Sequence, residues 1–243
     1  MSEAQPIVLF DLPCKDHGTP WSPNTWKARL VLNYKQIPYT TQWIEVNHIA
    51  PHFKSLGIPP NPPSISPKPY TVPTVRLPDG TYIMDAKRIA ASLEEKYPDP
   101  PIHLDSPQVA RVGECFGRLL VPMRGILLPK IARNLLNPES VPYFHESRSK
   151  QLGMPLEQLD KELGGDAQWE EAKPILREIA ALIEENGGPF VLGGEVSYAD
   201  FILVGALCLF KRLGEGVFER IVGMEPALET LYEASGKWLQ KVD

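Results

Sequence analysis

The sequence pattern of this 243-residue chain changes abruptly at Pro98-Asp-Pro-Pro101, and this change constrains the fold more than any other feature. Before it, short apolar or β-branched runs alternate with helical patterns, whereas only helical patterns occur beyond it. Three prolines within four residues cannot continue a helix. The segment therefore predicts a linker between two domains, residues 1–98 and 99–243.

The first domain is expected to contain strands and helices in the order βαβ and then ββα. Ser22-Pro23 is a helix-start signal, because serine can cap a helix and proline suits its first position. Thr71–Leu77 and Thr81–Met84 flank a Pro-Asp-Gly turn and predict a hairpin. The other expected elements are strands over Pro6–Leu12 and Tyr39–Val46 and helices from Pro23 to Tyr34 and over Asp85–Tyr97. This order is that of a thioredoxin-like α+β domain.

The second domain is expected to be entirely helical. Ser197 and Asp200 have the spacing of an N-terminal capping box ahead of an apolar helix. The helical patterns cover Pro107–Ala132, Glu139–Leu152, Pro155–Leu163, Ala167–Asn186, Tyr198–Leu213 and Pro226–Leu239. The predicted fold class is thus a thioredoxin-like N-terminal domain followed by an all-α C-terminal domain.

The composition argues against several classes of partner. A net charge of −5 favours neither nucleic acid nor an anionic membrane surface. The longest apolar stretch, Phe201–Phe210, is too short to span a bilayer, and Met1–Pro6 lacks the features of a signal peptide. The three cysteines lie far apart, which suits a reducing compartment and offers neither a disulfide framework nor metal-ligand spacing. These observations predict a cytoplasmic protein without a metal, a nucleic-acid partner or a membrane anchor.

Four stretches of the chain resemble the cytosolic glutathione transferases. They are Trp21-Ser-Pro-Asn-Thr-Trp-Lys-Ala-Arg29, Tyr70-Thr-Val-Pro-Thr74, Asp85-Ala-Lys-Arg-Ile89 and Ser197-Tyr-Ala-Asp-Phe201. The first stretch is the most specific, and it resembles the fungal etherase-related class, kin to bacterial β-etherases that cleave lignin-type aryl ethers. The resemblance implies glutathione as cosubstrate, bound by the N-terminal domain, and a hydrophobic or aromatic small molecule as the second substrate.

Ser22 matches the catalytic serine of that family. The resemblance implies that its hydroxyl donates a hydrogen bond to the glutathione thiolate, while the helix N-terminus behind it adds partial positive charge. The nucleophile is then the bound thiol rather than a side chain of the protein. From the Ser-Pro pair alone, a plain helix cap remains the alternative. Asn24 is either a polar contact near the thiol or a residue of a surface turn.

The resemblance also implies how the rest of glutathione is held. Pro73 matches the family's cis-proline, beside which the backbone of Val72 pairs with the cysteinyl part of glutathione as an added strand would. Asp85 and Ala86 stand where the family has an acid followed by serine, the pair that holds the γ-glutamyl end. Ala86 departs from this pattern because it has no hydroxyl, so only its backbone N–H remains available. Asp85 can alternatively be read as a helix N-cap.

Other residues carry weaker signals. Cys14 precedes the first helix by several residues and lacks clear electrostatic activation, so it is not expected to be a nucleophile. His48 and His52 are four residues apart, but Pro51 between them argues against a regular helix. Four apolar residues either line a pocket at the domain junction or belong to the core: Phe10, Trp21, Met123 and Leu127.

Three functions remain open from the sequence. The first is a glutathione transferase that conjugates glutathione to an electrophile or cleaves an activated aryl ether, as in detoxification. The second is a non-catalytic protein of the same fold that binds hydrophobic metabolites. The third is the glutathione-adding step of a fungal secondary-metabolite pathway. The chain is expected to act either alone or as a homodimer.

Overall fold

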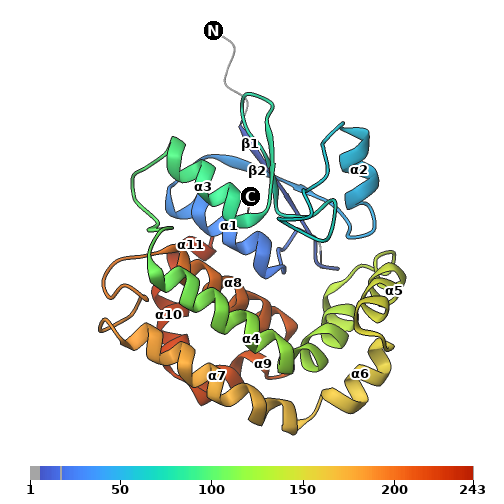
Figure 1. Ribbon diagram of the computed structural model, residues 1–243, viewed down its shortest axis with the longest axis vertical. Coiled ribbons are helices and arrows are strands. Elements are labelled where there is room, and N and C mark those ends of the chain that lie inside the picture. Colours follow the sequence, from blue (N-terminus) through green and yellow to red (C-terminus); the bar gives the residue numbers. More distant parts are fainter. Residues whose placement is uncertain (1–5, 17, 243) are drawn as a thin grey trace.

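The computed structural model describes residues 6–16 and 18–242. Met1–Gln5, where no signal peptide is expected, lie outside the described residues. A small sheet with its helices forms one part of the molecule, and a larger group of helices forms the other (Figure 1). The expected fold class, a thioredoxin-like domain followed by an all-α domain, is confirmed.

The sheet has four strands in the order β2-β1-β3-β4. Strand β1 (Ile7–Asp11) pairs in parallel with β2 (Tyr39–Trp43) and antiparallel with β3 (Thr74–Arg76), which in turn pairs antiparallel with β4 (Tyr82–Met84). Helix α1 (Pro23–Tyr34) makes the crossover that a parallel pair requires. Because β1 is central and helices cover the sheet on both sides, four of its five residues are buried.

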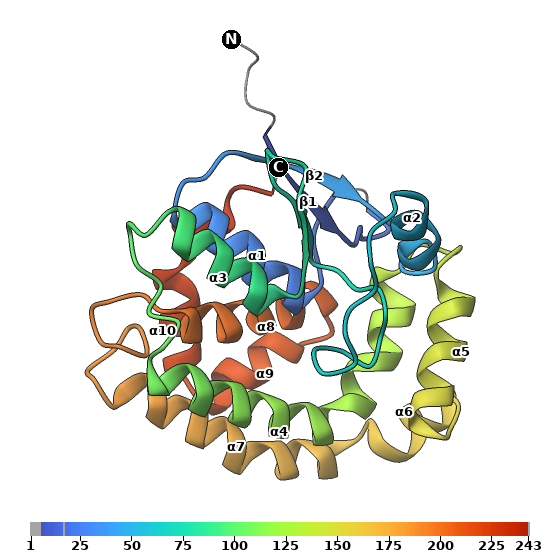
Figure 2. The same cartoon turned by 45° about the horizontal axis from the view of Figure 1, so that its top comes forward.

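The helices of the first domain lie on both sides of the sheet. Helices α1 and α3 (Ala86–Lys96) lie side by side on one face, and α2 (Ile49–Ser55) lies at the other side (Figure 2). The expectation that Pro51 prevents a regular helix was wrong, because Pro51 is the third residue of α2. Backbone N–H groups in the first turn of a helix have no intrahelical acceptor, so proline costs no hydrogen bond there.

The second domain is built around one buried helix. In α8, every residue from Tyr198 to Phe210 is buried, and the predicted capping box between Ser197 and Asp200 is confirmed. Within the described residues, no helix is long and apolar enough to cross a membrane. The helices of this domain are α4 (Pro107–Lys130) with the π-helical turn η1 (Ile131–Leu135), α5 (Val141–Leu152), α6 (Leu156–Leu163), α7 (Asp166–Glu184), α8 (Tyr198–Leu213), α9 (Val217–Met224), α10 (Ala227–Ala234) and α11 (Gly236–Leu239).

The two parts of the molecule share a continuous apolar core, and helix α1 packs against helix α8. Gly205 of α8 allows the backbones of these two helices to approach closely. A Cβ atom built on Gly205 of α8 would lie 2.8 Å from the carbonyl oxygen of Pro23 and 3.2 Å from Cβ of Trp26. Helix α8 therefore sets the position of the first turn of α1, the helix that Ser22 precedes.

Candidate functional site

Ser22 starts helix α1 through its backbone. It occupies the N-cap position with an extended conformation (φ −72°, ψ 125°), and its side chain makes no capping hydrogen bond. Its carbonyl oxygen accepts the first helical bond from Trp26 N at 3.0 Å and a second bond from Thr25 Oγ1 at 2.9 Å. If Ser22 were only a helix cap, its side chain would be expected to accept a hydrogen bond from the first turn of α1, and it does not. The hydroxyl is left for another acceptor at the positive end of the helix.

The loop before β3 presents backbone groups at the edge of the site. The Val72–Pro73 peptide bond is cis, as the resemblance implies. The Pro73 carbonyl oxygen accepts a hydrogen bond from Asp85 N at 3.2 Å, which joins this loop to the start of α3. In the described part of the chain, the N–H and C=O of Val72 form no backbone hydrogen bond. These two groups can therefore pair with an extended peptide.

Asp85 caps helix α3. Its Oδ1 accepts hydrogen bonds from Lys87 N at 3.0 Å and from Arg88 N at 3.2 Å, so the cap reading of this residue is correct. Its backbone has φ +80° and ψ 128°, which is unfavourable for a residue with a side chain and costs about 1–3 kcal/mol. Such strain is frequent at ligand sites. The other carboxylate oxygen, Oδ2, has no hydrogen-bond partner among the described residues, and Ala86 beside it is 4% exposed.

A cavity of about 440 Å³ gathers most of the expected site residues. Asn24, Val72, Pro73, Asp85 and Ala86 all line it, whereas Ser22 is not among its lining residues. Ser22 is 6% exposed and lies two residues before Asn24 in the chain. The other lining residues are Lys27, Ile65, Ser66, Thr71, Lys87, Val109, Ala110, Gly113, Phe116, Tyr198 and Ile202. A second cavity of about 400 Å³, between α4 and α7, contains none of the expected residues.

Several polar side chains of the cavity were not predicted as site residues, and two of them, Lys27 and Tyr198, have shifted pKa values. Lys27 lies one helical turn after Asn24 on α1, and this spacing, which places both on one face of a helix, was a signal in the sequence. Tyr198 comes from α8 in the other domain, so no local pattern could indicate it. Burial lowers the pKa of Lys27, with Asp85 opposing the change, while burial and the same carboxylate raise the pKa of Tyr198.

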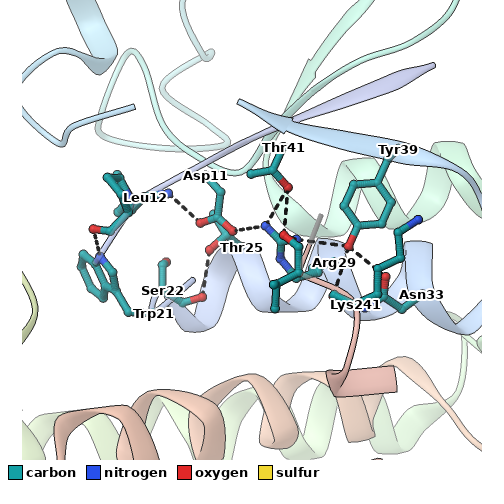
Figure 3. A network of polar contacts seen from close by, with 12 residues as sticks. Asp11, Leu12, Trp21, Ser22, Thr25, Arg29, Asn33, Tyr39, Thr41 and Lys241 are labelled. Carbon is teal, nitrogen blue, oxygen red and sulfur yellow. Dashed lines mark hydrogen bonds and ion pairs between the residues drawn. The ribbon is translucent and has the colours of Figure 1, made fainter. Parts of the chain in front are cut away.

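A buried polar network joins α1 to the strands β1 and β2 and to the C-terminal segment (Figure 3). Arg29 Nη2 lies 2.8 Å from Asp11 Oδ2, and both side chains are fully buried. Burial raises the pKa of Asp11, and the Arg29 guanidinium opposes this rise. Arg29 also donates to Tyr39 Oη at 3.1 Å and to the carbonyl oxygen of Val242, near the C-terminus. Strand β1, helix α1 and the C-terminal segment thereby meet at one guanidinium.

The C-terminal segment is held by further side chains of the first domain. Asn33 Nδ2 donates to the carbonyl oxygens of Trp238 at 2.7 Å and Lys241 at 2.9 Å. Thr41 Oγ1 donates to the carbonyl oxygen of Val242 at 3.2 Å. Since Asn33 and Arg29 both belong to α1, the segment from Trp238 to Val242 is hydrogen-bonded to the same helix that Ser22 begins.

Cys14 and the four apolar residues considered for a junction pocket belong to the interior, whereas His48 is exposed and His52 is half-buried. Burial raises the pKa of the Cys14 thiol, and Arg212 only partly opposes this. The four apolar residues considered for a junction pocket line neither of the two cavities described above. Every one of these side chains is at most 5% exposed: Phe10, Trp21, Met123 and Leu127. The core reading of these four residues is therefore the correct one.

Comparisons with known proteins agree with this arrangement. Family models for the N-terminal and C-terminal domains of glutathione S-transferase match residues 21–96 and 108–224. A glutathione S-transferase-like protein of Aspergillus flavus, ustS, is 32% identical, and the match covers 98% of this chain and 93% of that protein.

Solved structures agree as well. A glutathione S-transferase of Ceriporiopsis subvermispora, solved in complex with glutathione, has a TM-score of 0.85 at 29% identity, covering 96% of this chain and 98% of that one. Glutathione transferase GSTFuA2 of Phanerochaete chrysosporium has a TM-score of 0.82 at 30% identity, with coverage of 97% and 99%. The chain described here belongs to the glutathione S-transferase family.

Proposed function

We propose that this protein is a glutathione transferase whose 440 Å³ cavity receives the peptide part of glutathione. The observation that carries the proposal is the meeting of Asn24, Val72, Pro73, Asp85 and Ala86 in one cavity at the start of α1. The free backbone groups of Val72 pair with the cysteinyl residue. Asp85 Oδ2 accepts hydrogen bonds from the γ-glutamyl ammonium group, while Oδ1 continues to cap α3.

The Ser22 hydroxyl then donates a hydrogen bond to the glutathione sulfur. A free thiol of this type has a pKa of about 8.5, so only a small fraction is ionised at neutral pH. A hydroxyl donor and a helix N-terminus both stabilise the thiolate relative to the thiol. The thiolate attacks an electrophilic carbon of a hydrophobic or aromatic molecule and forms a C–S bond. In conjugation by addition, the carbanion formed takes up a proton; in ether cleavage, the C–O bond breaks and a phenolate leaves.

Turnover with glutathione tests this proposal. The purified protein is incubated with glutathione and a panel of aryl ethers, quinones and other activated aromatics, and products are identified by mass. We expect adducts whose formation requires glutathione and falls at least tenfold in Ser22→Ala, in line with the loss of one donor to a developing anion. Glutathione binding without turnover of any panel member would instead support the ligand-binding alternative. Absence of glutathione binding in the folded parent protein would overturn the proposal.

A further inference from the structure

The γ-glutamyl end of glutathione carries two opposite charges, an α-ammonium and an α-carboxylate. In the proposed site, the Asp85 carboxylate binds the ammonium group. The residue after it, Ala86, has no hydroxyl that could donate to the ligand's carboxylate. Because Asp85 repels a carboxylate, the backbone N–H of Ala86 alone is a weak counterpart. A group of positive charge in the same cavity is needed to complete the match.

Two lysines line the cavity, and they differ in their surroundings. Lys87 is exposed, whereas Lys27, on α1, is partly buried. Among the described residues, no carboxylate lies within salt-bridge distance of Lys27 Nζ; burial lowers the pKa of Lys27, and the charge of Asp85 only partly opposes this. An ammonium group that loses water and gains no ion pair is costly in the free protein, and an anionic ligand removes that cost.

We infer that Lys27 is the second charged residue of the glutathione site and binds the γ-glutamyl α-carboxylate, opposite to Asp85. This inference rests on the proposed glutathione site. Lys27 and Asp85 then form a pair of opposite charges that matches the pair on the ligand. Lys27 takes the place of the hydroxyl that Ala86 lacks, and the site recognises a zwitterion rather than a simple anion. The role is one of binding and specificity, since Lys27 does not touch the sulfur.

Two analogues of glutathione, each lacking one of the two charged groups of the γ-glutamyl end, test the two contacts one at a time. Glutaryl-Cys-Gly keeps the carboxylate and lacks the ammonium, whereas 4-aminobutyryl-Cys-Gly keeps the ammonium and lacks the carboxylate. Dissociation constants for both analogues and for glutathione are measured by calorimetry with the parent, Lys27→Met and Lys27→Arg. In Lys27→Met we expect binding of glutathione and of glutaryl-Cys-Gly to weaken by about ten- to hundredfold. Binding of 4-aminobutyryl-Cys-Gly should stay within about twofold, and Lys27→Arg should retain most of the affinity for glutathione.

Lys96→Met is the control, because Lys96 is an exposed lysine near the end of α3 that does not line the cavity. It should change each dissociation constant by no more than about twofold. Ala86→Ser supplies the absent hydroxyl, and it should tighten glutathione binding about tenfold in the Lys27→Met background but less in the parent.

The inference is overturned if Lys27→Met binds glutathione as the parent does, or if it weakens both analogues equally. Equal weakening would indicate a general effect on the cavity rather than a contact with the carboxylate. A parent protein that binds neither glutathione nor either analogue would overturn the proposed function itself. The two failures are therefore distinguishable.

Discussion

At the scale of single residues, Ser22 combines a structural position with a free hydroxyl. Its carbonyl group starts α1, while its side chain makes no capping bond. Ser22→Ala should therefore cost less than the roughly 1 kcal/mol typical of a lost capping side chain, and it should act mainly on the glutathione thiol. We expect a lower kcat, a modest change in glutathione affinity and an upward shift of the kinetic pKa. One pKa unit corresponds to about 1.4 kcal/mol of lost thiolate stabilisation.

Rates measured between pH of about 5.5 and 9 give this shift, because the profile of kcat/KM reports the ionisation of the reacting groups. A melting curve establishes that the variant is folded. If the folded variant has the pH profile and the rate of the parent, a group other than Ser22 activates the thiol.

Cys14 is a buried thiol of the first domain that lacks activation. It is 2% exposed, and burial raises the pKa of its thiol, so it is largely protonated at neutral pH. Cys14→Ser should keep the glutathione-dependent rate within about twofold of the parent. The rate assay is combined with mass spectrometry of the parent after incubation with oxidised glutathione. A mixed disulfide on Cys14 together with a collapse of activity in the variant would contradict this expectation.

At the scale of elements, the crossing of α1 and α8 depends on one glycine. A Cβ on Gly205 would lie 2.8 Å from the Pro23 carbonyl oxygen, so Gly205→Ala must push the start of α1 away from α8. We expect a loss of about 1–3 kcal/mol in the free energy of unfolding, as for other overpacked sites. The rate of the glutathione reaction should fall as well, because the displaced turn is the one that follows Ser22.

Gly117 in α4 is the matched control for this substitution. It is exposed and helical, and nothing lies within 4 Å of a Cβ built on it. Gly117→Ala should raise the free energy of unfolding by about 0.4–1 kcal/mol through the unfolded state, with an unchanged rate. Urea unfolding of both variants measures the difference. Equal effects of the two substitutions would mean that the α1–α8 contact can relax without cost.

At the scale of the whole molecule, the C-terminal segment joins the end of the chain to the first domain. Shortening the chain to residues 1–239 removes the carbonyl groups of Lys241 and Val242, which accept hydrogen bonds from Arg29, Asn33 and Thr41. At about 1 kcal/mol for each bond, we expect a loss of roughly 2–3 kcal/mol. For a protein of this size, that corresponds to a fall in Tm of about 5–10 °C.

Calorimetry of the shortened chain measures this fall, and Gln240→Ala serves as its control. Gln240 lies in the same segment, but its side chain makes none of these bonds. The control should keep the parent Tm to within about 2 °C, since surface substitutions rarely exceed 0.5 kcal/mol. An unchanged Tm in the shortened chain would mean that water replaces the lost carbonyl groups without cost.

The sequence alone determined the features that neighbouring residues encode. The helix start at Ser22-Pro23, the capping box at Ser197 and the hairpin that ends at Met84 were all correctly predicted, because caps, turns and periodicity act within a few residues. Helices α2 and α9 were not predicted. The sequence-based reading of α2 gave Pro51 too much weight, since proline breaks a helix only beyond its first turn.

Only the tertiary structure decided which residues of different elements lie together in the cavity. The cavity combines α1, the loop before β3, the start of α3, and two helices of the other domain, and Tyr198 reaches it from more than 100 residues away in the chain. The hydrogen bond from Arg29 to the carbonyl oxygen of Val242 likewise joins segments far apart in the sequence. Such contacts have no local signature, because they arise when whole elements pack and exclude water from the groups between them.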